Sequence, residues 1–210
     1  MSDIKEQIAK RTAMELRDGD VVNLGIGLPT IIPNYLPEGV SVILHSENGI
    51  VGTGVVTEET KDPIYVTDAG GQPAIADLGG AYVDSLMSFG LARGGHVDVA
   101  ILGALEVDEK GNLANWIIPG KKVPGMGGAM DLVVGAKKLI VAMEHTAKGS
   151  VKILKECKLP VTAVGCVDMI ITEMCVFEVT KDGLVLTELS DGYTLEDVKA
   201  ATEAAYSMAI

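Results

Sequence analysis

Residues 21–27 read VVNLGIG, an aliphatic segment that leads directly into two closely spaced glycines. This pattern is typical of a buried strand that ends in a tight turn, because glycine adopts backbone conformations that other residues avoid. Residues 40–45, VSVILH, repeat the pattern and lead into Ser-Glu-Asn-Gly at 46–49. Further strand candidates are residues 64–67, 97–102, 139–143, 161–164 and 176–179. Short aliphatic strands of this kind are a first indication of an α/β fold.

Helical segments separate the strand candidates. The first helix has Ser2 as its cap, Asp18-Gly19 as its stop, and an apolar face made by Ile4, Ile8, Thr12, Ala13 and Leu16. A brief helix is expected within residues 31–36, since prolines limit its length. The last helix begins at the capping-box pattern of residues 194–197 and is expected to turn these side chains inward: Leu195, Val198, Ala201, Thr202 and Ala205.

The alternation of short strands and helices predicts one architecture for the whole chain. We expect a Rossmann-like α/β fold with a mostly parallel sheet and helices on both faces. Residues 1–210 contain no repeat or long linker, so we expect a single domain. In such sheets ligands bind beyond the carboxyl ends of the strands. The residues that follow the strands are therefore the first candidates for a functional site.

Composition excludes several classes of function. Lys and Arg number 17 against 29 Asp and Glu, for a net charge of −12, and no basic stripe is present. We therefore expect no nucleic-acid partner. The three cysteines, Cys157, Cys166 and Cys175, are odd in number and spaced nine residues apart, which is neither a disulfide framework nor a zinc motif and favours the reducing cytoplasm. No apolar run approaches about 18 residues, and no leader peptide is apparent, so we expect no membrane segment. The three histidines lie far apart, and no metal site is predicted.

Glu47 and Asn48 follow the second strand candidate directly. A carboxylate in this position lies where open α/β sheets place reacting groups, and Asn-Gly is a turn signal that would hold it over the end of the sheet. The alternative is a surface glutamate beside a turn. The residue pattern by itself leaves both interpretations open.

Two glycine clusters offer backbone N–H groups to a ligand. Gly25 and Gly27 follow a strand as in a dinucleotide fingerprint, but Thr30 replaces the third glycine, which favours a plain strand-to-helix turn. An anion at the N-terminus of the following helix is compatible with either interpretation. Gly125, Gly127 and Gly128 precede an apolar segment, and such a nest can stabilise an oxyanion. A simple loop-to-helix connection explains these glycines equally well.

Several motifs together resemble one known family over essentially the whole chain. They are NLGIGLP at 23–29, SENG at 46–49, RGGH at 93–96, LANW at 113–116, PGK at 119–121, GMGGAMD at 125–131 and MEH at 143–145. In this order and spacing they resemble the B subunit of the class I (3-oxoacid type) CoA-transferases. Within that family they are most similar to the butyrate and acetate–acetoacetate group.

The resemblance implies a reaction and roles for individual residues. The family exchanges CoA between a short-chain acyl-CoA and a free carboxylate by a ping-pong mechanism through a glutamyl-CoA thioester. On this basis Glu47 is the expected nucleophile and Gly128 an expected oxyanion donor, while Gly25, Gly27, Asn48 and Gly127 are expected to contact substrate or CoA. No metal and no cofactor are implied, because CoA is itself a substrate. A CoA-transferase A subunit, in a hetero-oligomer of the A2B2 kind, is implied as the partner that supplies the remaining groups.

The sequence departs from the family pattern near the expected site. Val55 and Asp68 stand where relatives often carry Pro and Asn, which leaves the substrate open. Residues 69–73, AGGQP, resemble the acetoacetate, butyrate and acetate enzymes more than the succinyl-preferring ones, which tend to read AGKE. The alternatives are the B subunit of a succinyl-CoA:3-oxoacid CoA-transferase and an acyl-CoA hydrolase on the same scaffold. A ligand sensor or a sugar-phosphate isomerase of this fold would not need the SENG motif and the glycine cluster at 125–128 together.

Overall fold

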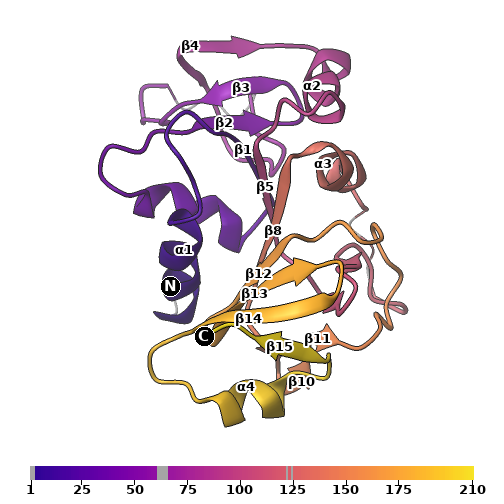
Figure 1. Cartoon of the computed structure of the whole chain (residues 1–210). Helices are drawn as coiled ribbons and strands as arrows, with labels where there is room; N and C mark the ends of the chain where they lie inside the picture. The colour runs from indigo at the N-terminus through magenta and orange to yellow at the C-terminus, as the bar shows by residue number, and fades with distance from the viewer. Residues whose placement is uncertain (1–2, 61–65, 122, 124) are drawn as a thin grey trace.

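Parallel strands form the middle of a large twisted sheet (Figure 1). The computed structural model describes residues 3–60, 66–121, 123 and 125–210. In spatial order the central strands are β12 (Met169–Ile171), β8 (Lys138–Ala142), β5 (Val99–Leu102), β1 (Val21–Leu24) and β2 (Ile43–Ser46), and each pairs with the next in parallel. These strands are short and aliphatic, as expected for strands that are covered on both faces.

Antiparallel strands extend the sheet at both ends. Beyond β2 lie β3 (Ile50–Thr53) and β4 (Ala76–Tyr82). Beyond β12 lie β13 (Cys175–Thr180), β14 (Gly183–Leu189) and β15 (Tyr206–Met208), the last of which pairs with β14 in parallel. Two small sheets contain β6 (Glu106–Asp108), β7 (Leu113–Ala114) and β11 (Ile153–Leu154), and β9 (Thr146–Ala147) with β10 (Ser150–Val151).

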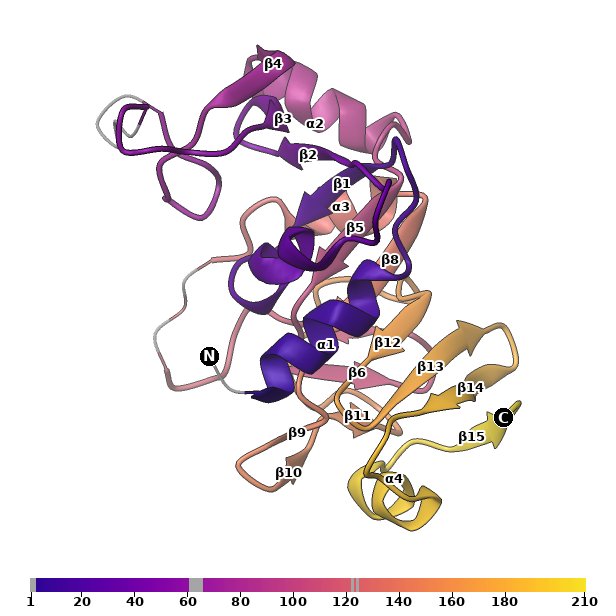
Figure 2. The same ribbon diagram turned by 90° about the vertical axis from the view of Figure 1, so that its left-hand side faces the viewer.

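Helices cover both faces of the sheet, as Figure 2 shows from the side. The helix α1 (Asp3–Ala13) and the 3₁₀ helix η1 (Leu28–Tyr35) lie on one face, where they share a core with Val99 and Ile101 of β5. The helix α3 (Ala129–Gly135) lies on the other face, with Ala100 and Leu102, and packs against α2 (Ser85–Arg93). Alternate side chains of β5 thus point to opposite faces of the sheet and pack into two separate cores. The predicted α/β class is confirmed.

The strand order changes direction between β1 and β5. The chain continues from β1 to β2 on one side, whereas β5 lies on the other side. Gly25 ends β1 here, and its amide donates to the Ile101 carbonyl at 2.8 Å. A Cβ at Gly25 would lie 2.9 Å from Leu102 Cδ2 and 3.3 Å from the Ile101 carbonyl oxygen, so a larger residue would require Leu102 to shift. Ligands bind at such switch points in open α/β sheets.

Some of the predicted elements differ from the structure. Residues 161–164 form no strand. Val161 and Val164 are exposed, and only Ala163 makes an isolated bridge, to Leu113. The predicted strand at 64–67 falls partly outside the described residues, and Thr67 makes only a bridge to Pro73. Ser2, the predicted cap, also lies outside them.

The predicted inward faces of the terminal helices are partly wrong. α1 ends at Ala13 in a run of tighter turns, before the predicted stop, and Ile4 is exposed. α4 (Leu195–Ala201) begins at the predicted capping box but is only seven residues long. Its Val198 is buried, whereas Leu195 and Ala205 face solvent. A helix this short has room for little more than one buried position.

Candidate active site

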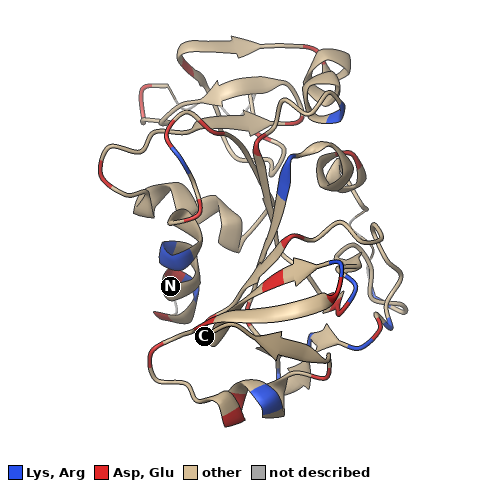
Figure 3. Cartoon of the chain, viewed as in Figure 1, with Lys and Arg blue, Asp and Glu red and all other residues tan. Residues whose placement is uncertain are grey.

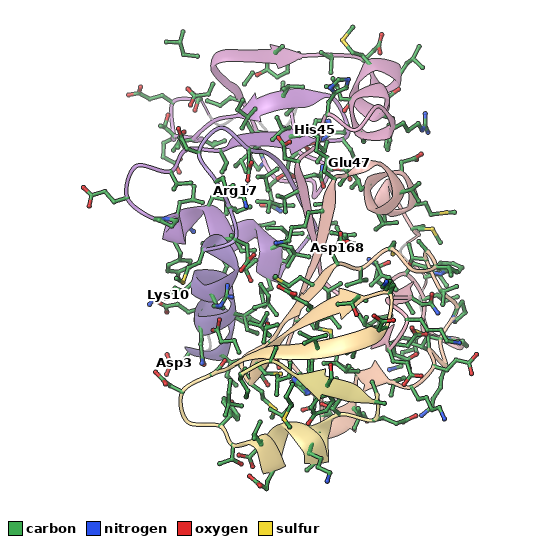
Figure 4. All side chains as sticks on the ribbon, viewed as in Figure 1. Asp3, Lys10, Arg17, His45, Glu47 and Asp168 are labelled. Carbon is green, nitrogen blue, oxygen red and sulfur yellow. The ribbon has the colours of Figure 1, made fainter. Side chains whose placement is uncertain are left out.

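A cleft of about 900 Å³ lies at the carboxyl ends of the central strands. It is lined by the ends of β1, β2 and β5 and by the loops at 68–72 and 125–129. Glu47 follows β2 immediately and lines this cleft as a half-buried side chain. Figure 4 shows Glu47 beside His45 in the upper half of the molecule. The carboxylate therefore lies at the end of a strand, where the sequence pattern placed it, and its role as a nucleophile stays a prediction.

The turn that carries Glu47 is held by its own side chains. Ser46 Oγ donates to Asn48 Oδ1 at 2.8 Å and accepts from the Ala69 amide at 2.9 Å. Asn48 Nδ2 donates to the Thr67 carbonyl at 2.7 Å. Gly49 has a φ of 128°, and a Cβ there would collide with the Val83 carbonyl oxygen. Asn48 thus fixes the turn, and its role in substrate binding stays a prediction.

Asn23 contacts Glu47 from the neighbouring strand. The Asn23 side chain is 1% exposed, and its Nδ2 donates to Glu47 Oε2 at 3.1 Å and to the His45 carbonyl at 3.0 Å. Asn23 Oδ1 is buried with no hydrogen-bond partner among the described residues. Asn23 was not among the site residues predicted from sequence, although a polar side chain inside the aliphatic run VVNL is an available signal.

Gly128 lies directly against the Glu47 side chain. It is the residue that precedes α3, and a Cβ built on it would lie 3.0 Å from Glu47 Cγ and 2.9 Å from Phe89 Cε1. Gly127, next to it, also lines the cleft and has a φ of 58°. The fold therefore brings together the SENG and GMGGAMD motifs, which lie about 80 residues apart in the sequence, as the family resemblance implies. Their roles toward a substrate stay predictions.

Gly25 and Gly27 line the same cleft in a tight turn. Gly27 has a φ of 93° and precedes η1, and Thr30 closes the turn through its amide and its hydroxyl, both of which donate to the Gly27 carbonyl. A 3₁₀ helix with Pro33 inside it follows. A dinucleotide fingerprint requires an α-helix at this point, so the plain-turn interpretation is favoured.

The charges around the cleft are negative. Among its described lining residues Glu47 and Asp68 are acidic, and none is Lys or Arg. Figure 3 shows basic residues dispersed over the ribbon and no basic stripe in the part that is drawn in colour. Burial lowers the pKa of His45 below its ordinary value, so this neighbour of Glu47 is neutral at neutral pH. The arrangement can present a carboxylate nucleophile, but within the described residues it has no cation for a phosphate.

A second buried histidine belongs to a separate cluster. His145 Nδ1 is 2.9 Å from Thr172 Oγ1, and its Nε2 is 2.9 Å from Thr202 Oγ1. Its amide donates to Glu173 Oε2 at 2.9 Å. Burial, with a smaller contribution from Lys152, lowers the pKa of His145 to about 4. None of these side chains is among the described residues that line the cleft, and the cluster joins β8, β12 and the end of α4.

Other candidate groups carry no chemistry. The three cysteines are free, and burial raises the pKa of Cys157 to about 12 and that of Cys166 to about 11. Thiols with such pKa values are poor nucleophiles at neutral pH. No group of three metal-ligating side chains occurs among the residues that the structure describes. In the same part of the chain, no helix is long and apolar enough to cross a membrane.

The chain is similar to proteins of one family. Residues 5–201 match the model of the family described as Coenzyme A transferase. The beta subunit of acetate CoA-transferase from Escherichia coli (strain K12) is 56% identical over 208 residues, which are 99% of this chain and 95% of that protein. The B subunit of succinyl-CoA:3-ketoacid coenzyme A transferase from Helicobacter pylori (strain ATCC 700392 / 26695) is 46% identical over 206 residues, which are 98% of this chain and 99% of that protein.

Solved structures support the fold. The apoenzyme of the acyl-CoA transferase YdiF from Escherichia coli O157:H7 matches with a TM-score of 0.75 and 24% identity over 98% of this chain. This chain spans 42% of that longer chain. The likeness therefore concerns the fold of one part of that protein.

Proposed function

The chain belongs to the Coenzyme A transferase family, and we propose that it is the catalytic subunit of a two-subunit enzyme that acts through Glu47. The single observation that carries this proposal is the juxtaposition of a half-buried glutamate at the end of β2 with Asn23 and Gly128. The reaction moves CoA from a short-chain acyl-CoA to a free carboxylate. Because CoA is a substrate, the mechanism uses no resident cofactor.

The proposed reaction uses the Glu47 carboxylate as the nucleophile. It attacks the thioester carbonyl of the acyl-CoA, so that an acyl-glutamyl anhydride forms and CoA leaves as a thiolate. The thiolate then attacks the glutamyl carbonyl of the anhydride, which forms a glutamyl-CoA thioester and releases the first carboxylate. An incoming carboxylate reverses both steps. Covalent storage of CoA on Glu47 divides one difficult exchange into easier steps.

Asn23 and Gly128 have complementary tasks in this proposal. Asn23 Nδ2 holds one Glu47 oxygen at 3.1 Å, which leaves the other free to attack. The Gly128 backbone N–H donates to the oxyanion that develops as the tetrahedral carbon forms. Donors of this kind lower the barrier because they are already oriented before reaction. The absence of a side chain at Gly128 allows the backbone to lie this close to Glu47.

The partner is a second, different subunit that supplies positive charge. CoA carries phosphates, whereas this chain has a net charge of −12 and the described lining of its cleft contains no Lys or Arg. The two relatives above are named as subunits of CoA-transferases, which supports an A subunit as the partner. We propose an A2B2 hetero-oligomer in the cytoplasm, where free cysteines persist. The isolated chain is expected to be inactive, and robust exchange without the A subunit would contradict this.

Acetate, butyrate and acetoacetate are the proposed acceptors. A dicarboxylate such as succinate needs a cation for its second carboxylate, but Gly71 and Gln72 occupy an exposed turn beside the cleft. The higher identity to the acetate-type relative agrees with this preference. A kcat/KM for succinate equal to that for butyrate would contradict it. Measuring thioester loss with and without acceptor separates transfer from the hydrolase alternative.

The decisive experiment traps the covalent intermediate. The assembled enzyme, given acyl-CoA without acceptor, is expected to accumulate a CoA adduct on this chain, and peptide mass spectrometry should place it on Glu47. Freshly prepared Glu47→Gln keeps the size of the side chain but loses the carboxylate, so exchange should fall at least about 10⁴-fold, or about 5 kcal/mol of barrier. An adduct at another residue, or a Gln variant that retains a few per cent of the rate, would overturn the assignment.

A further inference from the structure

Two further buried side chains, His45 and Ser88, continue the polar contacts of Asn23. In the parallel pairing of β1 with β2, Asn23 lies opposite His45. Asn23 Nδ2 is 3.3 Å from His45 Nδ1, and His45 Nε2 is 2.9 Å from Ser88 Oγ. His45 is 4% exposed and Ser88 is fully buried. A continuous chain of polar contacts therefore leads from α2 through His45 and Asn23 to Glu47.

The contacts fix the orientation of the Asn23 amide. Its nitrogen faces two oxygens that can only accept, the His45 carbonyl at 3.0 Å and the Glu47 carboxylate at 3.1 Å. The reversed amide would place an oxygen against both, which is repulsive. Both amide hydrogens already point to these oxygens, so the longer 3.3 Å contact to His45 Nδ1 can only share one of them, and a hydrogen on Nδ1 would oppose the amide. The ring proton of neutral His45 is then on Nε2 and is donated to Ser88 Oγ.

Ser88 Oγ, which can donate or accept, accepts from His45 Nε2 in the tautomer that the Asn23 contact favours. Without an acceptor at Ser88, the ring loses the contact that favours a proton on Nε2, and a proton on Nδ1 would oppose the Asn23 amide. The next residue of α2, Phe89, lies against Gly128. Successive residues of one helix therefore support the nucleophile and the glycine that faces it.

We propose that His45 and Ser88 are positioning residues that hold the Asn23 amide, and through it the Glu47 carboxylate, in the attacking orientation. This rests on the proposed function of Glu47. Neither side chain needs to touch substrate, so their loss should reduce kcat and leave KM nearly unchanged. Small displacements of a nucleophile are costly because the reacting atoms must already lie near the attack geometry.

The positioning role also predicts a signature in the pH profile. Protonation would place a hydrogen on His45 Nδ1, which could then no longer accept from Asn23. The groups that face the ring are Asn23 on β1, Val51 on β3 and Ser88 on α2, and Glu47 is the charged neighbour. Below the pKa of His45 the rate should therefore show an extra fall that depends on the imidazole.

The test uses the assembled two-subunit enzyme and four variants of this chain. Ser88→Ala should lower kcat about 10-fold and His45→Leu about 30-fold or more, with KM within about twofold of the parent. His45→Gln provides an amide that accepts and donates but does not titrate, so it should recover most of the loss and remove the extra fall in acid. Ser85→Ala removes an exposed hydroxyl from the same helix and serves as the matched control.

Folding and the underlying mechanism are monitored separately. Circular dichroism and thermal melting report on folding. If His45→Leu does not fold, Ser88→Ala and His45→Gln decide the matter. The positioning role would be overturned if Ser88→Ala and His45→Gln both kept the parent kcat and the parent fall in rate at acid pH. A raised KM with an unchanged kcat would overturn it as well. In either case an adduct on Glu47 would still support the proposed function. Absence of that adduct in the parent enzyme would instead refute the role of Glu47, and this proposal with it.

Discussion

His45 and His145 are both buried next to hydroxyl groups, yet their surroundings differ. His145 has a threonine hydroxyl at each ring nitrogen and an amide bound to Glu173, so its polar atoms are fully engaged. His45 belongs to a chain of contacts that ends at a carboxylate in an open cleft, beside a buried oxygen of Asn23 that lacks a partner among the described residues. Burial of a polar side chain therefore does not by itself mark function.

The contrast between the two histidines separates a scaffold from a site. A fully satisfied buried network rigidifies the fold, and its loss is expected to lower stability. A network that orients a reactive group toward a cleft is expected to affect turnover more than stability. Variants around His45 should therefore lower turnover more than stability, and variants around His145 should lower stability more than turnover.

After Glu47, Gly128 is expected to give the greatest change in turnover. In Gly128→Val the new side chain would collide with Phe89 and with Glu47, so the N–H of residue 128 would move and kcat should fall about 10²–10³-fold, as for loss of an oxyanion donor. Steady-state kinetics and size-exclusion chromatography of the assembled enzyme provide the measurement. Gly90→Ala, where a Cβ meets open space, is the control. A Gly128→Val enzyme with the parent rate would remove Gly128 from the site.

The pH dependence of stability tests the His145 region. The pKa of His145 is about 4 in the folded chain against 6.5 for the unfolded group, so the unfolded state binds more protons between these values. The stabilisation is complete above pH 6.5 and is lost as the pH falls toward 4, by about 3 kcal/mol at about 1.4 kcal/mol per pKa unit. Urea unfolding of the parent and of His145→Leu over this range isolates the contribution. Equal slopes for both would contradict the assignment to His145.

His145→Leu should also separate stability from turnover at neutral pH. It removes the contacts of the ring with the buried Thr172 hydroxyl, which keeps the Cys175 carbonyl as a partner, and with the half-buried Thr202 hydroxyl. The loss should cost about 2 kcal/mol of unfolding free energy. Because the cluster is not part of the described cleft lining, kcat should stay within about twofold of the parent. A large loss of kcat in the folded variant would show that the two regions are coupled.

The weakest response is expected at the start of α4. Thr194 and Asp197 form a capping box, and the C-terminal end of the same helix carries Thr202 to His145. Thr194→Ala should lower stability by about 1 kcal/mol and leave kcat unchanged. The control is Ser150→Ala, which removes an exposed hydroxyl in β10, outside α4. Chemical denaturation of the two variants gives the comparison, and a cost at Ser150 equal to that at Thr194 would argue against a specific capping effect.

The sequence predicted those parts of the fold that depend on local pattern. The aliphatic runs at β1, β5, β8 and β13 were recognised because uninterrupted apolar segments are typical of covered strands. The strand β12 was not, because it has only three residues and follows Asp168, whose carboxylate accepts from the Leu139 amide. The strand predicted at 161–164 is wrong because those valines have no sheet to pair with.

The candidate site was predictable in part for the same reason. Glu47 follows a strand and Gly128 stands in a glycine-rich motif, so local sequence pointed to both. Asn23, His45 and Ser88 meet only because β1 pairs with β2 and α2 packs behind them. Their partners are set by tertiary structure, which single-strand patterns do not encode. The single-domain organisation stays a prediction.

The pairing of β1 with β5 also bears on the order in which the chain acquires its reactivity. The Val21 amide binds the Asp98 carboxylate, 77 positions later, and Gly25 rests against Leu102. During synthesis β1 must wait for β5, and Gly128 emerges later still. Such long-range contacts close slowly, because loop entropy is lost before they form. A nascent or truncated chain therefore carries Glu47 without the groups that surround it in the fold, and the site proposed around it is assembled only when most of the polypeptide has been made.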